Sequence, residues 1–144
     1  MLNSEQKKFL EHNKNKKIIF TNGCFDILHC GHVSYLNEAK SLGELLIVGL
    51  NSDLSVKRLK GDSKPINQEQ DRKYVLENLK AIDLVIIFKE NTPLNLIKEI
   101  TPDILVKGGD WSADQIVGSD FVISNGGSVQ TLSFKNGHST TNII

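Results

Sequence analysis

Residues 17–32 spell KIIFTNGCFDILHCGH, an apolar run that passes through a glycine-containing turn into the start of a helix. The apolar part predicts a short strand over Lys17–Thr21. The residues that follow the turn predict a helix over 32–42. A strand that leads directly into a helix in this way is typical of α/β proteins. This stretch therefore sets the fold class.

The same alternation of strands and helices continues along the chain. The helix expected over 68–81 carries one apolar stripe, and the strand expected over Leu45–Leu50 is apolar at consecutive positions. Strands of that kind are typical of parallel sheets that are buried on both faces. The sequence therefore predicts an α/β fold, a doubly wound, Rossmann-like parallel five-stranded sheet with helices on both faces. The other expected strands are Leu84–Phe88, Ile104–Val106 and Val129–Leu132, and the other expected helices are 4–15, 53–59, 93–100 and 112–125.

Length and composition bound the class of protein. The 144 residues, 39% of them apolar, suffice for one sizeable core, so we expect a single domain over 1–144 with an N-terminal helical extension over 1–16. The 17 basic and 17 acidic side chains cancel, which argues against a nucleic-acid partner. The apolar runs are too short for a membrane span, and the polar N-terminus has no signal-peptide core. With only two cysteines, too few for a disulfide scaffold, we expect a cytoplasmic protein without nucleic-acid or membrane partners.

Two histidines, His29 and His32, flank Cys30-Gly31 at the expected helix start. A helix N-terminus offers free backbone N–H groups and the positive end of the helix dipole, and imidazoles can donate to phosphate oxygens. Gly31 permits close backbone approach, so these residues favour an anion site. Two other interpretations stay open, ordinary turn residues and zinc ligands at short spacing. Zinc is weakened because no further cluster of His and Cys follows.

Polar residues also follow the second expected strand. Asn51-Ser52-Asp53 either contacts a ligand or supplies the N-cap of the next helix. Downstream, residues 57–64 hold four cations, and Gly61 and Pro65 interrupt the segment. This pattern predicts a mobile loop, which is either solvated or closes over a polyphosphate.

The fourth expected strand and the C-terminal region lead into further polar stretches. Lys107-Gly108-Gly109-Asp110-Trp111 permits close backbone approach to a planar ligand or a phosphate. Lys107 can neutralise charge there, and Asp110 can accept from a base or a ribose. Ser139-Thr140-Thr141, at an expected helix start, is typical of a phosphate seat. Together these stretches favour a nucleotide site.

Assembled in order, these motifs resemble the signature of the cytidylyltransferase-like nucleotidyltransferases, whose hallmark is H-x-G-H. Within that superfamily the nearest resemblance is to the D-glycero-β-D-manno-heptose 1-phosphate adenylyltransferases, and it covers residues 17–144. It implies transfer of AMP from ATP to the sugar 1-phosphate by in-line attack on the α-phosphorus, in the biosynthesis of ADP-heptose and lipopolysaccharide. The matching stretches are residues 21–32, Asn51-Ser52-Asp53, Arg58-Leu59-Lys60-Gly61, Pro65-Ile66-Asn67, Asp71-Arg72, Val106-Lys107-Gly108-Gly109-Asp110 and Ser139-Thr140-Thr141.

The resemblance also implies a role for each matched residue. The implied catalytic residues, which hold the triphosphate and stabilise charge on its α-phosphoryl group, are His29, His32, Lys60 and Lys107. The implied nucleotide-binding residues are Asn22, Gly23, Phe25, Gly31, Gly108, Asp110, Ser139, Thr140 and Thr141. The implied substrate-binding residues are Asn51, Asp53, Lys57, Arg58 and Arg72. Mg²⁺ is implied as the cofactor that bridges the phosphates, with Asp26 as its nearest candidate ligand.

Two other functions remain open from the sequence. A cytidylyltransferase acting on CTP and glycerol 3-phosphate also carries H-x-G-H and a similar ending, although residues 22–26 and 106–110 fit the heptose enzymes better. A non-catalytic nucleotide-binding module is the third interpretation. The expected partners are ATP and a sugar 1-phosphate, together with a second copy in a homodimer. Because the family's enzyme is often fused to a ribokinase-like sugar kinase, which these residues lack, we expect that kinase on a separate chain.

Overall fold

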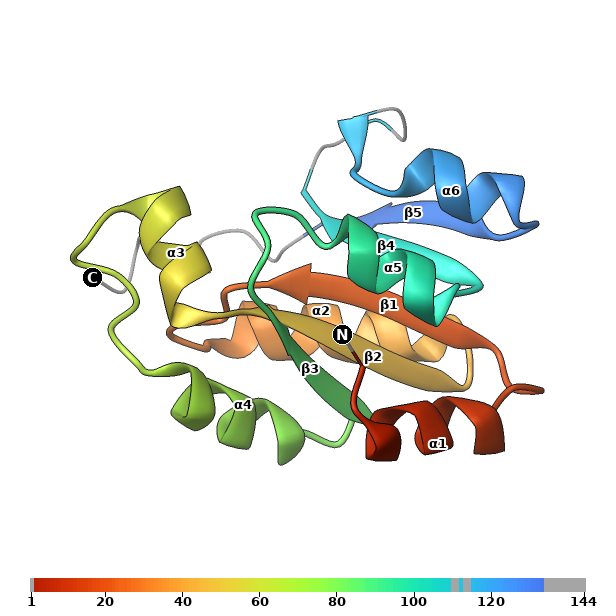
Figure 1. The fold of residues 1–144 in the computed structure, drawn as a ribbon, viewed down its shortest axis with the longest axis horizontal. Coiled ribbons are helices and arrows are strands. Elements are labelled where there is room, and N and C mark those ends of the chain that lie inside the picture. Colours follow the sequence, from red (N-terminus) through yellow and green to blue (C-terminus); the bar gives the residue numbers. More distant parts are fainter. Residues whose placement is uncertain (1, 110–111, 113–114, 134–144) are drawn as a thin grey trace.

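The computed structural model describes residues 2–109, 112 and 115–133, which form one five-stranded sheet whose strands are all parallel. The strand order is β3-β2-β1-β4-β5, so the predicted doubly wound α/β fold is confirmed (Figure 1). The strands are β1 (Ile18–Gly23), β2 (Leu45–Asn51), β3 (Leu84–Phe88), β4 (Ile104–Gly108) and β5 (Ser128–Leu132).

Helices cover both faces of the sheet. The helices are α1 (Ser4–His12), α2 (Cys30–Ser41), α3 (Asp53–Lys60), α4 (Glu69–Glu77), α5 (Leu94–Ile100) and α6 (Ser119–Ser124). Apolar side chains of α2 and α4 pack on one face, and those of α1, α5 and α6 pack on the other. In Figure 1, α2 accordingly lies behind the sheet and α5 lies in front of it. Across the described residues, no helix combines the length and the apolar character that a membrane span requires.

The interior strand β2 is buried at all seven of its positions, as its apolar run predicts. Close packing extends to the backbone at Gly49, where an added Cβ would lie 2.7 Å from Cζ of Phe20. A larger residue at that point of the sheet would therefore overlap a ring that has no exposed surface.

The strand order reverses beside β1. The chain runs outward from β1 through β2 to β3 and then returns to place β4 on the other side of β1. In open α/β sheets, ligands bind beyond the carboxyl ends of the strands at such a switch in order. The carboxyl ends of β1 and β4, at Gly23 and Gly108, therefore mark the expected site.

The prediction of a mobile loop from residue 57 is wrong for its first residues, because α3 continues to Lys60. Ser52 caps the N-terminus of α3 by accepting from the backbone N–H of Ser55. Three of the four basic residues of the segment, Lys57, Arg58 and Lys60, lie in the last turn of α3, where they complement the negative end of the helix dipole. Gly61, with φ of 100°, then ends the helix in a conformation that glycine adopts easily.

Two other helices are shorter than expected. The helix predicted over 68–81 ends at Glu77, with Asn78 as its C-cap. The helix predicted over 112–125 is α6, which begins only at Ser119. Its N-cap, Gly118, has φ of 89°, so the preceding residues cannot continue the helix through that position.

Candidate active site

Two neighbouring cavities open at the carboxyl ends of β1 and β4. The first, of about 280 Å³, is here called the histidine cavity, and it is lined by Asn22, Gly23, Cys24, Phe25, Asp26, His32, Tyr35, Lys60, Lys107 and Gly108. The second, of about 300 Å³, is here called the amide cavity, and it is lined by Asn22, Gly23, Cys24, Asn51, Leu59, Asn91, Thr92, Pro93, Lys107, Gln115, Ile116 and Val117. Lys107 and the last residues of β1 border both, so two ligands bound there would meet beside them.

The start of α2 is organised by its two histidines. His29 is the N-cap, and its Nδ1 accepts a hydrogen bond of 3.0 Å from the backbone N–H of Gly31. The backbone N–H of His29 in turn donates to Nδ1 of His32, 3.3 Å away. A ring nitrogen that accepts a hydrogen bond carries no proton, so each neutral imidazole carries its proton on Nε2. His32, which lines the histidine cavity, thus has Nε2–H as a potential donor to an anion, whereas Nε2 of His29 is buried.

His32 is held as a neutral ring. Burial, assisted by the nearby His29 and Lys60, lowers the pKa of His32 from 6.5 to about 4. The ring of His29 lies beside it at a centroid distance of 4.0 Å, and the ring of Phe25 approaches edge-on at 5.8 Å. At neutral pH this imidazole therefore serves as a hydrogen-bond donor without positive charge.

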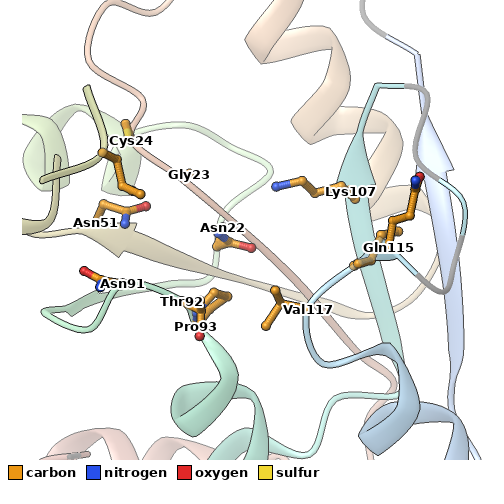
Figure 2. Close-up of a pocket in the computed structure, with 12 residues that line it drawn as sticks. Asn22, Gly23, Cys24, Asn51, Asn91, Thr92, Pro93, Lys107, Gln115 and Val117 are labelled. Atoms are coloured by element: carbon orange, nitrogen blue, oxygen red, sulfur yellow. The ribbon is translucent and has the colours of Figure 1, made fainter. Parts of the chain in front are cut away.

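Positive charge comes instead from two lysines on different elements. Lys60 ends α3 and Lys107 lies in β4, and both line the histidine cavity. Lys107 also lines the amide cavity, and Figure 2 shows its side chain extending toward the space beside Asn22. The structure thus brings together three of the four residues predicted to be catalytic, His32, Lys60 and Lys107, around one cavity. The fourth, His29, stacks beside His32.

Several neutral polar side chains line the amide cavity. Asn22 and Asn51 come from the carboxyl ends of β1 and β2, and Asn91 and Thr92 come from the connection after β3 (Figure 2). Such side chains both donate and accept hydrogen bonds, which suits a ligand with several hydroxyl groups. The sequence prediction included Asn22 and Asn51 but missed Asn91, Thr92 and Gln115. The strand-end rule would have found Asn91 and Thr92 if it had been applied to the third strand.

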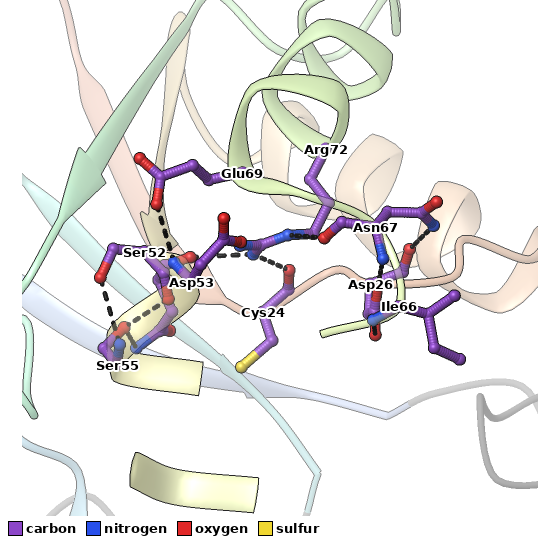
Figure 3. A network of polar contacts seen from close by, with 10 residues as sticks. Cys24, Asp26, Ser52, Asp53, Ser55, Ile66, Asn67, Glu69 and Arg72 are labelled. Atoms are coloured by element: carbon purple, nitrogen blue, oxygen red, sulfur yellow. Dashed lines mark hydrogen bonds and ion pairs between the residues drawn. The ribbon is translucent and has the colours of Figure 1, made fainter. Parts of the chain in front are cut away.

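Arg72, predicted to bind substrate, is buried and 2% exposed. Its guanidinium donates to the backbone carbonyls of Cys24, Asn51 and Asn67 at 2.8–2.9 Å, and it pairs with the carboxylate of Asp53 at 2.8 Å (Figure 3). Asp53, which was also predicted to bind substrate, is therefore paired with Arg72. Neither residue lines either cavity.

The remaining basic residues of α3 also lie away from the cavities. Arg58 donates from Nε to Oδ1 of Asn91 at 2.7 Å and from Nη2 to the carbonyl of Lys89. It thereby ties α3 to the connection after β3 and orients one wall of the amide cavity. Lys57 is exposed and lines neither cavity.

The described residues do not fit a resident Mg²⁺ site. No three side chains of His, Cys, Asp or Glu among them gather where they could hold a metal ion. The candidate ligand Asp26 accepts through both carboxylate oxygens, from the backbone N–H groups of Ile66 and Asn67 at 2.7 and 2.8 Å. These contacts tie Asp26 to the connection between α3 and α4.

The two cysteines, Cys24 and Cys30, are not joined in a disulfide. Burial raises the pKa of the Cys24 thiol above its ordinary value, so that side chain remains a neutral thiol at pH 7. Cys30 is exposed. Of the predicted nucleotide-binding residues, Gly31 is buried in the first turn of α2, whereas Asp110, Ser139, Thr140 and Thr141 lie outside the described residues.

The chain is similar to a known family and to proteins of known name. A family model described as Cytidylyltransferase-like matches residues 20–144. The bifunctional protein HldE of a Nitratiruptor species is 57% identical over 133 residues, which cover 92% of this chain and 28% of that protein. HldE of Campylobacter concisus is 55% identical over 97% of this chain and 29% of its own length. The chain thus spans less than a third of these relatives.

Solved structures extend the comparison to the fold. The lipopolysaccharide core biosynthesis protein of Thermoplasma volcanium superposes with a TM-score of 0.68 and 30% identity, over 83% of this chain and 97% of that chain. Pantothenate synthetase of Thermus thermophilus superposes with a TM-score of 0.56 over 88% of this chain and 58% of that chain. At 13% identity, the second likeness concerns the fold alone.

Proposed function

The chain belongs to the cytidylyltransferase-like family of nucleotidyltransferases, and from this premise we propose that it transfers AMP from ATP to D-glycero-β-D-manno-heptose 1-phosphate. The products are ADP-heptose and pyrophosphate. The observation that carries the proposal is the convergence of His32, Lys60 and Lys107 on one cavity at the switch in strand order. The relatives named HldE and the lipopolysaccharide core biosynthesis protein support the choice of acceptor.

The reaction needs charge stabilisation more than proton transfer. An oxygen of the sugar phosphate, already anionic at neutral pH, attacks the α-phosphorus of ATP in line with the bond to the leaving pyrophosphate. The new O–P bond forms as the bond to the β-phosphate oxygen breaks, and pyrophosphate leaves with the electron pair. No general base is required. Negative charge on the α-phosphoryl oxygens must be stabilised by fixed donors and cations.

The histidine cavity supplies such groups. We assign the Nε2–H group of His32, which lines this cavity, to the oxygens of the α-phosphoryl group, since its Nδ1 accepts a backbone hydrogen bond. The role of His29 in holding the triphosphate remains a prediction from the sequence, because His29 does not line the cavity. Lys60 and Lys107 neutralise phosphate charge from two sides. The predicted nucleotide-binding residues Asn22, Gly23, Phe25 and Gly108 line the same cavity. The assignments of Asp110, Ser139, Thr140 and Thr141 to base, ribose and phosphates remain predictions from the sequence.

We assign the sugar to the amide cavity. Lys107 on its border attracts the sugar phosphate, and the neutral amides around it match hydroxyl groups that both donate and accept. Of the predicted substrate-binding residues, Asn51 keeps that role. Asp53, Arg58 and Arg72 act through other residues in this proposal, because each is paired away from the cavities.

Mg²⁺ enters this proposal only as part of the ATP complex, because the described residues offer it no set of ligands. Mg²⁺ commonly keeps several waters and binds through substrate phosphates. The sugar kinase expected on a separate chain and the homodimer stay predictions.

An assay of pyrophosphate release tests the proposal, with ATP or CTP crossed against heptose 1-phosphate or glycerol 3-phosphate in the presence of Mg²⁺. We expect turnover only with ATP and the heptose phosphate. Turnover with CTP and glycerol 3-phosphate would support the cytidylyltransferase instead. Nucleotide binding without turnover in any combination would support the non-catalytic module.

A further inference from the structure

We propose that Asp26 is a positioning residue, whose carboxylate holds the connection between α3 and α4 and thereby keeps Phe25 against His32. The group formed by Asp26, Ile66, Asn67 and Arg72 is here called the Asp26 clamp (Figure 3). Its expected effect on turnover rests on the proposed function, whereas its expected effect on the backbone does not.

Three hydrogen bonds join Asp26 to two consecutive residues. Its Oδ2 accepts from the backbone N–H of Ile66 at 2.7 Å, and its Oδ1 accepts from that of Asn67 at 2.8 Å. Its backbone carbonyl accepts from Nδ2 of Asn67 at 2.7 Å. Bonds to an ionised carboxylate are stronger than those between neutral groups. A charged acceptor on the loop after β1 thus fixes residues that lie about forty positions further along the chain.

Arg72 closes the clamp from the other side. Its Nε donates to the carbonyl of Asn67 at 2.9 Å, and its Nη1 donates to the carbonyl of Cys24 at 2.8 Å. Cys24 and Asp26 are the two neighbours of Phe25 in the chain. The backbone on both sides of Phe25 is therefore tied to the same pair, Asn67 and Arg72.

Phe25 has a conformation that requires such support. Its φ of 46° lies in the left-handed region, which is unfavourable for a residue with a side chain. Such a conformation persists only where the surrounding structure over-determines it. The ring lies close over Gly23, where an added Cβ would be 2.9 Å from Cε2 of Phe25, and it meets His32 edge-on. Hydrogen bonds to Cys24 and Asp26 thus place a ring that packs against an imidazole of the site.

The clamp and the metal-ligand interpretation of Asp26 predict different results for Asp26→Asn. The amide retains one acceptor oxygen but turns its NH₂ group toward the second backbone N–H, which weakens the clamp. If His32 is then misplaced, kcat falls by about 10- to 100-fold, while KM for ATP changes by less than about threefold. The Mg²⁺ concentration for half-maximal rate stays at the wild-type value. A metal ligand would instead require more Mg²⁺.

Two further variants complete the design. Asn67→Ala removes the bond to the carbonyl of Asp26, and because both residues act in one clamp, the double variant should lose less than the product of the single losses. Asp62→Asn makes the same chemical change on the same connection, at an exposed residue outside the clamp, and should retain the wild-type rate. Hydrogen exchange at the amides of Ile66 and Asn67 should be faster in Asp26→Asn and unchanged in Asp62→Asn.

Three results would overturn the inference: a raised Mg²⁺ requirement with unchanged amide exchange, fully multiplicative losses in the double variant, or wild-type kcat in Asp26→Asn despite faster exchange. If the wild-type protein itself shows no turnover, the proposed function fails, and the clamp is judged on exchange and ATP affinity. Faster exchange with weakened ATP binding in Asp26→Asn would then support it. Unchanged exchange would refute it.

Discussion

The backbone N–H of His29 donates to Nδ1 of His32, and the two imidazole rings lie with their centroids 4.0 Å apart. This arrangement assigns the proton of the neutral His32 ring to Nε2, and burial beside His29 disfavours a positive charge on that ring. The start of α2 is therefore suited to donate hydrogen bonds to an anion, while Lys60 and Lys107 supply the positive charge.

The rate should tolerate acid better than an ordinary histidine would allow. Because burial lowers the pKa of His32 to about 4, the imidazole of the free enzyme stays neutral through the range in which an unperturbed ring gains a proton. We therefore expect His32 to contribute no loss of kcat/KM with a midpoint near pH 6.5. A pH profile of kcat/KM measures this. An acid limb near that ordinary histidine value that disappears in a His32 variant would contradict the neutral donor.

The lowered pKa of His32 should also make the free energy of unfolding depend on pH. Between pH 6.5 and about 4 the unfolded chain binds a proton at His32 that the folded chain does not, so the free energy of unfolding falls as the pH falls through this window. In His32→Gln that contribution is absent, and the fall should be shallower than in the wild type. Urea titrations at about pH 7, 5.5 and 4.5 measure both. Parallel curves for the two proteins would show that His32 does not contribute.

Lys107 should matter to both substrates. Because Lys107 borders both cavities, Lys107→Ala removes a cation from the junction to which the proposed function assigns both substrate phosphates. We expect a loss of about 100-fold in kcat/KM for ATP and for the sugar phosphate. Lys80→Ala removes the same charge from an exposed position outside both cavities and serves as the control. A loss confined to KM for one substrate would assign Lys107 to that substrate alone.

Arg72 should stabilise the fold rather than bind substrate. Arg72→Met leaves Asp53 and three backbone carbonyls without their common donor, which should cost about 3 kcal/mol of unfolding free energy. Arg58→Met, at the surface, should cost less than about 1 kcal/mol. Denaturant titrations compare the two variants. A fully stable Arg72→Met protein with a raised KM for the sugar phosphate would restore the substrate-binding interpretation.

The fold could be predicted because short apolar strands alternate with amphipathic helices along the whole sequence, and each can be recognised from its own residues. Strands such as β2 are apolar at consecutive positions when both faces are covered, and the alternation with helices then favours a parallel sheet. Ligands of such sheets bind beyond the carboxyl ends of the strands, and this rule pointed to Asn22, Lys107 and Gly108. The C-terminus of α3 was harder to predict, because the run of cations that suggests a loop is also favourable at the end of a helix.

The contacts of Arg72 and Asp26 could not be predicted for a different reason. Three of the acceptors of Arg72 are backbone carbonyls, and Asp26 accepts from backbone N–H groups. Every residue has a carbonyl, and nearly every residue has an N–H, so such partners carry no signature in the sequence. An arginine and an aspartate near a predicted phosphate site then resemble ligand-binding residues although the fold itself uses them.

The most direct measurement of the central claim follows the oxygens of the acceptor. Heptose 1-phosphate labelled with ¹⁸O at the non-bridging phosphate oxygens is incubated with ATP and Mg²⁺, and the products are analysed by ³¹P NMR and mass spectrometry. Attack by the sugar phosphate on the α-phosphorus predicts ADP-heptose that retains all of the label, including the oxygen between its two phosphorus atoms, together with unlabelled pyrophosphate. Absence of a labelled nucleotide sugar, or label in the pyrophosphate, would contradict the account.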